Sequence, residues 1–249
     1  MSVSASLIAA SAALRAASLD LCSDEYLLLL AKPTEIASLS RLAHDPADSV
    51  LWRKARGIPA NRGRIEDLIG ARATLLVTMG GGAKSSGAIA RRLGVATLAL
   101  PFPATIGEVD ANIVSVARAL GNGQRADRWR AELDRLRVSP PPASDSIFLS
   151  SGGQSVGMRS LSAQWMRLAG FAQRSLPGGR ASLETLLTTP PRRLLRSDYR
   201  HSQVSLGQRW LEHPAVRRLA SRTTITDGRP WTCAGPAMVS EVARLRGQR

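Results

Sequence analysis

Short apolar runs alternate with segments of helical periodicity along the chain, and this alternation occurs twice. In the first half, the apolar run at 74–79 ends in three glycines and precedes a helix at 84–93. In the second half, the run at 147–150 ends in a glycine-rich loop and precedes a helix at 160–169. Strands that alternate with helices predict parallel sheets, which bind ligands at the carboxyl ends of the strands. The expected strands are 16–21, 35–39, 74–79, 95–100, 147–150, 193–197 and 223–226.

A helical bridge separates the two halves. Apolar residues at three- and four-residue steps define one face of a helix at 106–120, and Gly121 and Asn122 accept the left-handed conformation that ends a helix. A second helix at 124–137 stops before the three prolines at 140–142. The chain is thus divided into a pre-segment at 1–13, an N-terminal α/β lobe at 14–104, the bridge with its proline-rich spacer at 105–143, and a C-terminal α/β lobe at 144–249.

The composition fits a globular chain of two lobes. The 249 residues suffice for two lobes of about 100 residues each. Hydrophobic content is 44% and the mean hydropathy is -0.07, and no apolar run approaches the roughly 18 residues that a membrane span needs. Residues 1–13 are small and apolar like the core of a secretion signal, but they lack the positive charge that normally precedes that core. They are compatible with export without establishing it.

The net charge of +15 raises the question of an anionic partner. Arginine supplies all but three of the 34 basic residues, and the arginines are scattered along the chain, a pattern that GC-rich codons produce without functional demand. Aromatic residues make up only 4%, which leaves few surfaces on which bases could stack. We therefore expect no nucleic-acid binding. A solvated basic surface and an anionic ligand or partner both stay open.

Two stretches resemble catalytic motifs. Gly80, Gly81 and Gly82 precede Lys84 and Ser85, but the glycine spacing of a phosphate-binding loop is not met. The stretch 153–157 satisfies G-x-S-x-G, with its serine several residues beyond the strand rather than on a sharp turn. An α/β serine hydrolase is therefore the alternative function. Its residues would be Ser155, Asp198 and His201.

The two halves also share a short acidic motif. Glu66 and Glu184 each stand at the start of a short helix that precedes a strand. A carboxylate at this point is favoured by the helix dipole, so an ordinary helix-start role is one interpretation. Their equivalent places in two similar lobes make a paired role the other.

Several stretches form a recognisable set through their order and spacing. They are 17–28, 36–40, 90–95, 109–113, 182–187, 197–199, 213–216 and 228–236. Together they resemble the iron-siderophore and cobalamin substrate-binding proteins of bacterial ABC importers, and the resemblance covers nearly the whole chain after about residue 14.

The resemblance implies a fold and a role. The expected fold is α/β, with two Rossmann-like lobes joined by a single long helix, as in class III periplasmic binding proteins. The implied role is a non-enzymatic, monomeric periplasmic carrier that delivers a corrinoid (cobalamin) or iron-siderophore ligand to a membrane permease. In the family, one glutamate on each lobe docks onto arginines of the permease, and Glu66 and Glu184 occupy the matching positions. We expect no cofactor, no resident metal and no catalytic residue.

We expect the ligand to lie in a cleft between the lobes. Trp52 and Trp231 suit a large flat ligand, although burial in the lobe cores is the competing interpretation. Which of cobalamin, siderophore or haem is bound stays open. Further candidates follow predicted strand ends, namely Asp24, Gly81, Ser151, Gln154, Arg159 and Tyr199.

Two cysteines, Cys22 and Cys233, are expected at strand ends facing this cleft, one from each lobe. The first would lie between the strand at 16–21 and a helix at 25–31 capped by Ser23 or Asp24. A disulfide would lock the lobes together, which argues against it if ligand exchange requires the lobes to separate. We therefore expect unpaired cysteines that line the ligand site, with a disulfide and coordination of a metal in the ligand as the alternatives.

Overall fold

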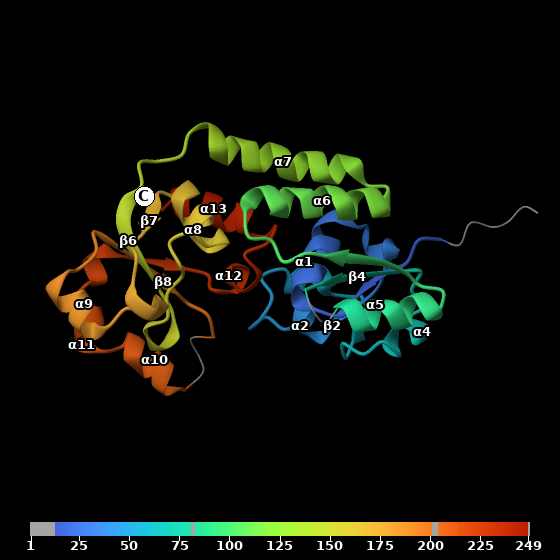
Figure 1. Cartoon of the computed structure of the whole chain (residues 1–249), viewed down its shortest axis with the longest axis horizontal. Coiled ribbons are helices and arrows are strands. Elements are labelled where there is room, and N and C mark those ends of the chain that lie inside the picture. Colours follow the sequence, from blue (N-terminus) through green and yellow to red (C-terminus); the bar gives the residue numbers. More distant parts are fainter. Residues whose placement is uncertain (1–12, 81–82, 201–203, 249) are drawn as a thin grey trace, which may run out of the picture.

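The computed structural model describes residues 13–80, 83–200 and 204–248. Figure 1 shows two lobes side by side, with the long helices α6 (Ile106–Leu120) and α7 (Gly123–Val138) running across the top. Each lobe contains one parallel sheet. The predicted two-lobed α/β fold is confirmed. None of the helices in the described ranges is long and apolar enough to cross a membrane.

The N-terminal lobe has a five-stranded sheet in the order β3-β2-β1-β4-β5. Its central strands are short and buried throughout, as expected where helices cover both faces of a parallel sheet. The strands are β1 (Ala16–Ser18), β2 (Ile36–Ser40), β3 (Ala60–Asn61), β4 (Leu75–Met79) and β5 (Ala96–Leu100). The helical segments are α1 (Leu21–Leu30), η1 (Pro33–Glu35), α2 (Arg41–His44), α3 (Trp52–Ala55), α4 (Asp67–Gly70) and α5 (Ala83–Arg92).

The C-terminal lobe has a four-stranded sheet in the order β7-β6-β8-β9. Its strands are β6 (Ser144–Leu149), β7 (Phe171–Gln173), β8 (Arg193–Ser197) and β9 (Thr223–Thr226). Its longer helices are α8 (Leu161–Leu168) and α13 (Met238–Arg246). Its short helical segments are η2 (Ser151–Gly153), η3 (Pro177–Gly179), α9 (Leu183–Thr188), α10 (Leu206–Leu211), α11 (Pro214–Arg217), η4 (Ala220–Arg222) and α12 (Arg229–Cys233).

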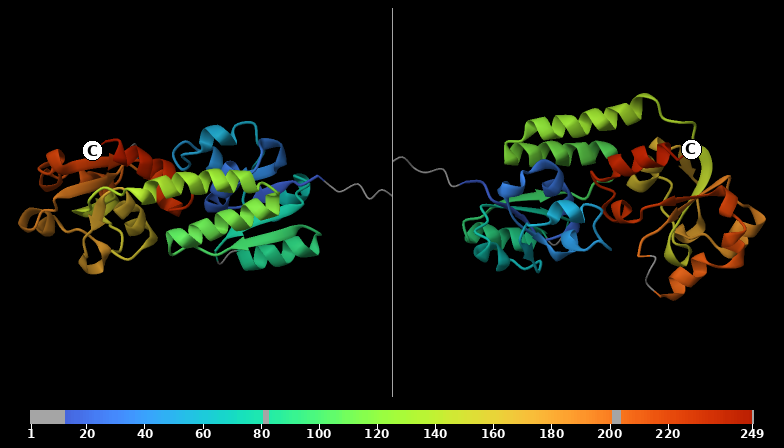
Figure 2. Two further views of the ribbon diagram at one scale, coloured as in Figure 1. Left: turned by 90° about the horizontal axis from the view of Figure 1, so that it is seen from above. Right: turned by 180° about the vertical axis from the view of Figure 1, so that it is seen from behind.

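The bridge begins and breaks where its sequence predicts. Thr105 caps α6 by accepting a hydrogen bond from the backbone N–H of Glu108, and Gly121 ends the helix with φ of 66°. Helix α6 packs against α1, whereas α7 packs on α6 and reaches α13 of the other lobe. Figure 2 shows from two further sides that α7 extends from the N-terminal lobe towards the C-terminal lobe.

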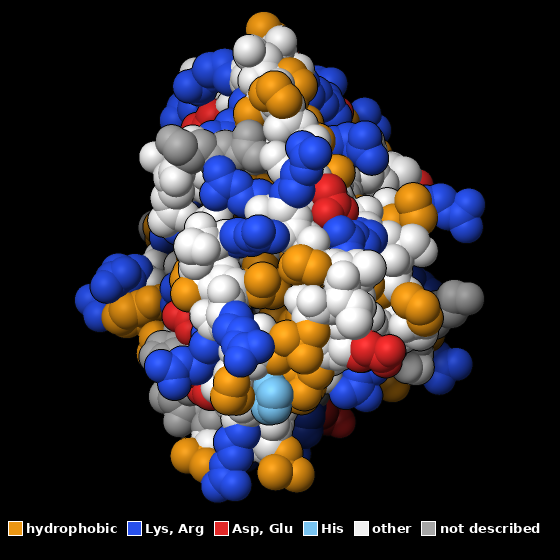
Figure 3. Space-filling model, turned by 90° about the vertical axis from the view of Figure 1, so that its left-hand side faces the viewer, with side chains coloured by type: hydrophobic (Ala, Val, Ile, Leu, Met, Phe, Trp, Pro, Cys, Tyr) orange, Lys and Arg blue, Asp and Glu red, His pale blue; other side chains and the backbone are white. Residues whose placement is uncertain are grey.

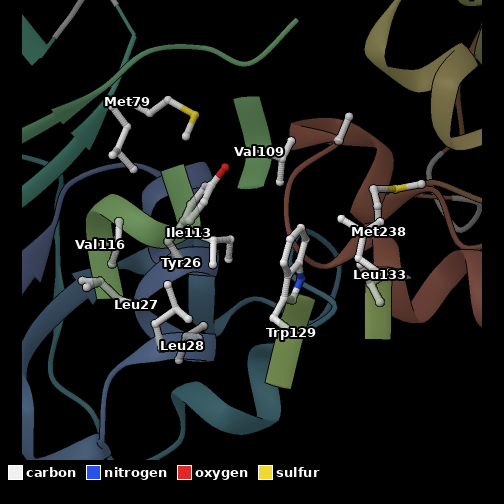
Figure 4. Close-up of a cluster of buried hydrophobic side chains, with 14 of the residues drawn as sticks. Tyr26, Leu27, Leu28, Met79, Val109, Ile113, Val116, Trp129, Leu133 and Met238 are labelled. Carbon is white, nitrogen blue, oxygen red and sulfur yellow. The ribbon is translucent and has the colours of Figure 1, made fainter. Parts of the chain in front are cut away.

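Both lobes and the bridge share one apolar core. Figure 4 shows Tyr26 of α1 to the left of Trp129, Val109 of α6 above it and Met238 of α13 to its right. The indole N–H of Trp129 donates to the backbone carbonyl of Pro236 at 2.9 Å, so this side chain joins α7 to the C-terminal lobe by a polar contact as well. The interface behind the cleft is therefore a continuous packed core rather than a loose hinge.

Three local expectations are wrong. Strand β1 ends at Ser18, and α1 begins at Leu21 because Asp20, not Ser23 or Asp24, is its N-cap, accepting from the backbone N–H of Ser23 at 2.8 Å. The early start of α1 places Cys22 in the first helical turn instead of at a strand end. The strands β3 and β7 were not expected, since two or three residues carry too little periodicity to be recognised.

Candidate ligand-binding cleft between the lobes

The carboxyl ends of the strands of the two sheets face each other between the lobes. Contacts that cross from one lobe to the other come from the segments that follow β1, β2, β8 and β9. In parallel sheets these ends carry the ligand sites, because the loops there converge from several strands. The space between the lobes is therefore the candidate ligand-binding cleft.

A disulfide between Cys22 and Cys233 joins the lobes. Cys22 lies in the first turn of α1 and Cys233 at the end of α12, with Cα atoms 5.4 Å apart and a sequence separation of 211. The expectation of unpaired cysteines is wrong. It assumed that the lobes separate when ligand exchanges, but they already share a buried core, so a covalent bond at the base of the cleft adds little further restriction.

Glu25 is buried at the same junction. Burial raises the pKa of its carboxyl to about 8, and the backbone N–H of Ala237 in the other lobe opposes this rise. A Cβ atom at Gly235 would lie 3.0 Å from Oε2 of Glu25, so glycine allows the two lobes to approach closely there. The first turn of α1 is thus joined to the 233–237 segment by a covalent bond with a buried carboxyl beside it.

Asp24 does not line the cleft. Its side chain is fully buried, and it accepts hydrogen bonds from the hydroxyls of Ser18 and Ser40 and from the backbone N–H of Ser40 at 3.1 Å. Burial raises the pKa of this carboxyl to about 7. Asp24 therefore ties β1 and β2 to α1. The expectation that it contacts ligand is corrected, because it has no exposed surface to offer.

The loop at 46–49 of the N-terminal lobe crosses the cleft and is held by the other lobe. Asp48 Oδ1 accepts hydrogen bonds from the Tyr199 hydroxyl at 2.9 Å and from Nε of Arg200 at 3.0 Å, and Nη2 of Arg200 also contacts it. Arg229 donates to the backbone carbonyl of Pro46 at 2.8 Å. We call this loop with its three partners the latch. No sequence pattern indicated Asp48, Arg200 or Arg229, since a loop carboxylate carries no periodic signal.

Two cavities adjoin Arg200. The first, of about 300 Å³, is polar, and none of the described residues that line it is a carboxylate; the second, of about 530 Å³, has three arginines and two aspartates in its wall. Ser151 and Tyr199, both predicted from sequence, lie together in the first cavity. The first cavity is lined by Ser150, Ser151, Ser197, Tyr199, Arg200, Ser205 and Gln208, and the second by Pro46, Ala47, Asp198, Arg200, Ile225, Asp227, Arg229, Arg244 and Gln248.

Trp52 and Trp231 do not form a pair of aromatic surfaces on which a flat ligand could pack. Trp231 is only 8% exposed, packs on Phe148 with ring centroids 5.0 Å apart, and donates from Nε1 to the Thr226 hydroxyl at 2.7 Å. It belongs to the core, as its competing interpretation held. Trp52 is half-buried, with the guanidinium groups of Arg53 and Arg56 at 4.7 and 4.5 Å from its ring centroid.

The remaining predicted ligand residues follow β6. Gln154 is exposed and pairs in an isolated antiparallel bridge with Arg180, and Arg159 is exposed in the loop before α8. Neither lines the two cavities beside Arg200. Gly81 and His201 lie outside the described residues.

Ser155 has a structural role. Its hydroxyl donates to the backbone carbonyl of Phe148 at 2.6 Å and accepts from Nε2 of Gln173 at 3.1 Å, which fastens the loop after β6 to its own sheet. A hydrolase nucleophile instead needs its hydroxyl hydrogen-bonded to a base. Nothing in this geometry favours the serine hydrolase.

Glu66 and Glu184 are exposed at the starts of α4 and α9. Asp67 accepts from the backbone N–H of Arg62 at 2.8 Å, and Ser182 caps α9 by accepting from the N–H of Thr185 at 2.9 Å. Neither glutamate side chain makes a capping hydrogen bond, but Glu66 is the N-cap residue of α4 and Glu184 lies in the first turn of α9, so the helix-dipole interpretation stays open beside the paired role.

The charges and metal ligands of the described residues define what the surface offers. Figure 3 shows the outer end of the C-terminal lobe with basic side chains spread among apolar and neutral ones rather than gathered in one stripe. In the parts of the chain that the structure describes, no group of three or more His, Cys, Asp or Glu could hold a metal ion.

The arrangement of two parallel-sheet lobes, one bridging helix and a cleft at the strand ends defines the class III periplasmic-binding-protein fold. The chain is similar over 94% of its length to a periplasmic heme-binding protein, RhuT from Roseiflexus sp. RS-1, covering 97% of that chain with TM-score 0.69 and 20% identity. It is also similar to HutB, a periplasmic heme-binding protein of Vibrio cholerae, with TM-score 0.70, 17% identity and coverage of 94% and 98%. A periplasmic binding protein from Veillonella parvula gives TM-score 0.70 at 14% identity, with coverage of 96% and 92%. All three are named as binding proteins rather than enzymes. No protein-family model matches the chain, and no curated protein matches its sequence.

Proposed function

We propose that this chain is the substrate-binding component of a bacterial ABC importer, which works in the periplasm as a monomer without enzymatic activity. The observation that carries the proposal is the class III fold over nearly the full chain, shared with binding proteins of that compartment. The cleft between the lobes would hold the ligand, and the shared core behind it would keep the lobes at a nearly constant distance.

The proposed ligand is a large tetrapyrrole-type metal complex or an iron chelate that bears negative groups. Two of the similar proteins are named as heme-binding, which makes haem the first candidate here, with a corrinoid and a ferric siderophore as alternatives. Arginine, tyrosine and serine side chains beside the cleft favour an anionic ligand, because they donate hydrogen bonds and arginine is always charged. Trp52, Ser151 and Tyr199 stay as proposed ligand contacts, and Gln154 and Arg159 would reach a ligand from the rim.

The proposed partner is the permease of the importer. Glu66 and Glu184 are exposed, one on each lobe, and they make no capping bond that would explain them. Two carboxylates at a fixed separation can orient the whole carrier on arginines of a membrane protein. Exposed ion pairs contribute only about 0–1 kcal/mol each, so the two would set the orientation while other contacts supply affinity.

The test is a direct titration of the purified protein with haemin, cobalamin and several ferric siderophores, followed by absorbance and by tryptophan fluorescence. We expect saturable binding of at least one of them with a stoichiometry near one. Trp52→Phe should reduce the fluorescence response if the ligand contacts the half-buried indole. A flat response to all of these ligands would contradict the proposed function.

A further inference from the structure

The latch places a carboxylate of one lobe on paired donors of the other. Asp48 is only 4% exposed, and all three of its contacts with Tyr199 and Arg200 converge on one oxygen, Oδ1. A guanidinium and a phenol directed at one carboxylate oxygen are how proteins recognise a carboxylate-bearing ligand. The bond crosses 151 residues of sequence, so it arises from the closed arrangement of the lobes and not from local chain geometry.

The surroundings of Arg200 have the character of a ligand site. The described residues that line the polar cavity beside it present serine hydroxyls and the Gln208 amide, and none of them is a carboxylate. Arg200 itself has φ of 49°, a left-handed conformation that a residue with a side chain adopts only at a cost. Strained backbone persists where surrounding contacts hold it, and the contacts observed at this side chain are those to Asp48 and to the Tyr199 ring.

The lobes need not separate for Asp48 to leave. The disulfide and the shared core hold them together behind the cleft. The loop at 46–49 is held from its other side by Arg229, which bonds to backbone carbonyls of Pro46 and Ser49 and keeps Asp227 as its own carboxylate partner. Release of Asp48 therefore requires movement of one short loop and breaks one ion pair, with Arg200, and one charge-assisted hydrogen bond, from the Tyr199 hydroxyl.

We propose that Tyr199 and Arg200 form a recognition site for a carboxylate of the ligand, and that Asp48 occupies this site as an internal carboxylate until the ligand displaces it. The inference rests on the proposed carrier function and names the chemical class of its ligand, an iron chelate or tetrapyrrole that carries free carboxylates. In the loaded protein, the ligand carboxylate accepts from the Tyr199 hydroxyl and the Arg200 guanidinium, and the Asp48 side chain turns to solvent.

The test compares haemin with its dimethyl ester, which has the same ring and iron but no free carboxylate. Asp48→Asn keeps the size of the side chain and removes the competing charge. We expect it to raise the affinity for haemin by about tenfold, the scale of one charge-assisted hydrogen bond, and to leave the affinity for the ester within twofold of the wild type. Affinities are measured by absorbance titration, with melting temperatures to establish that each variant is folded.

Arg200→Gln tests the same site by removing the charge that would bind the ligand carboxylate. It should lower the affinity for haemin by about tenfold or more and abolish the gain from Asp48→Asn in the double variant, because the two changes act on one interaction. Asp45→Asn is the control for charge in the same loop, and Arg196→Gln is the control for an arginine of the same lobe that pairs with the exposed Glu212. Both controls should leave both affinities unchanged.

Three outcomes would overturn the inference. Equal gains for haemin and ester in Asp48→Asn would mean that the loop acts only as a steric barrier. Unchanged binding of both would mean that Asp48 does not compete with the ligand. Binding of cobalamin by the wild type without binding of haemin by the wild type or by Asp48→Asn would also reject the carboxylate site, while the proposed carrier function would stand.

Discussion

The two lobes meet through apolar side chains at the back of their junction and through polar side chains at the front. At the back, Tyr26, Trp129 and Met238 belong to a core in which the described side chains are buried and apolar. At the front, the lobes meet through Asp48, Tyr199 and Arg200, which are polar and lie beside cavities. Packed apolar surfaces resist small displacements, whereas a polar pair can exchange one hydrogen-bonding partner for another. Under the proposed function, the difference teaches that ligand exchange would involve the front and leave the back in place.

The largest effect on stability is expected from Trp129→Ala, which removes a side chain from the apolar core at the back of the junction. The variant removes a nearly buried indole and its hydrogen bond to Pro236, so the free energy of unfolding should fall by about 3–5 kcal/mol. Urea unfolding measures this change. Trp52→Ala is the matched control, because Trp52 is half-buried between two arginines at the surface and should cost far less. If the two variants lost similar amounts of unfolding free energy, the distinction between the apolar back and the polar front of the junction would be wrong.

The next effect concerns the disulfide. Replacing Cys22 and Cys233 together with serine should lower the free energy of unfolding by about 2–4 kcal/mol and leave ligand affinity within about twofold of the wild type, because the core still holds the lobes. Thiol counting on the denatured, unreduced wild type should find no free thiol. If the variant instead loses ligand binding, the covalent bond rather than the core determines the spacing of the lobes.

Glu25 gives the back of the junction a dependence on pH. Burial raises the pKa of Glu25 from 4.5 to about 8, so between these values the folded protein binds a proton that the unfolded chain does not. The stability contributed by this group is full below about pH 4 and is lost as the pH rises to about 8. Glu25→Gln should therefore be more stable than the wild type at pH 8, by about 1–3 kcal/mol, and closer to it at pH 5. Urea unfolding at the two pH values checks this, and Glu132→Gln, an exposed change on α7, serves as control.

The smallest effect on stability is expected at Glu66 and Glu184, which belong to neither side of the junction. Each change to alanine should shift the free energy of unfolding by less than about 0.5 kcal/mol and leave ligand affinity unchanged, since neither carboxylate caps its helix. Each should lower transport, and the double variant should lower it further. High salt should weaken association of the wild type with the permease more than that of the double variant. A loss of several degrees in melting temperature would assign the glutamate a structural role.

The fold is largely predictable from the sequence, and the latch is not. Strand β4 (Leu75–Met79) and helix α6 (Ile106–Leu120) carry long apolar patterns with clear ends, so their places follow from periodicity. The start of α1 differs from the prediction because three acidic or hydroxyl residues near 20–24 are all acceptable caps, and only the folded geometry selects Asp20. Asp48 finds its partners in another lobe, so no pattern in its own surroundings could indicate them.

The residues of the candidate site were likewise only partly predictable from the sequence. Ser151 and Tyr199 were recognised because they follow strands, and they do line a common cavity. Trp231 and Asp24 follow strands equally well but are buried, because the chain turns back into the lobe after each strand before it reaches the cleft. Position after a strand thus indicates which loop is near the cleft, while the direction of the side chain depends on packing.

The placement of the two cysteines also bears on how the molecule is completed. Cys22 and Cys233 belong to different lobes and are 211 positions apart, so the bond can close only after both lobes have been made and have packed against each other under oxidising conditions. A chain whose C-terminal lobe has misfolded leaves the thiol of Cys22 unpaired. The bond therefore distinguishes correctly assembled molecules chemically from those in which the lobes have not met.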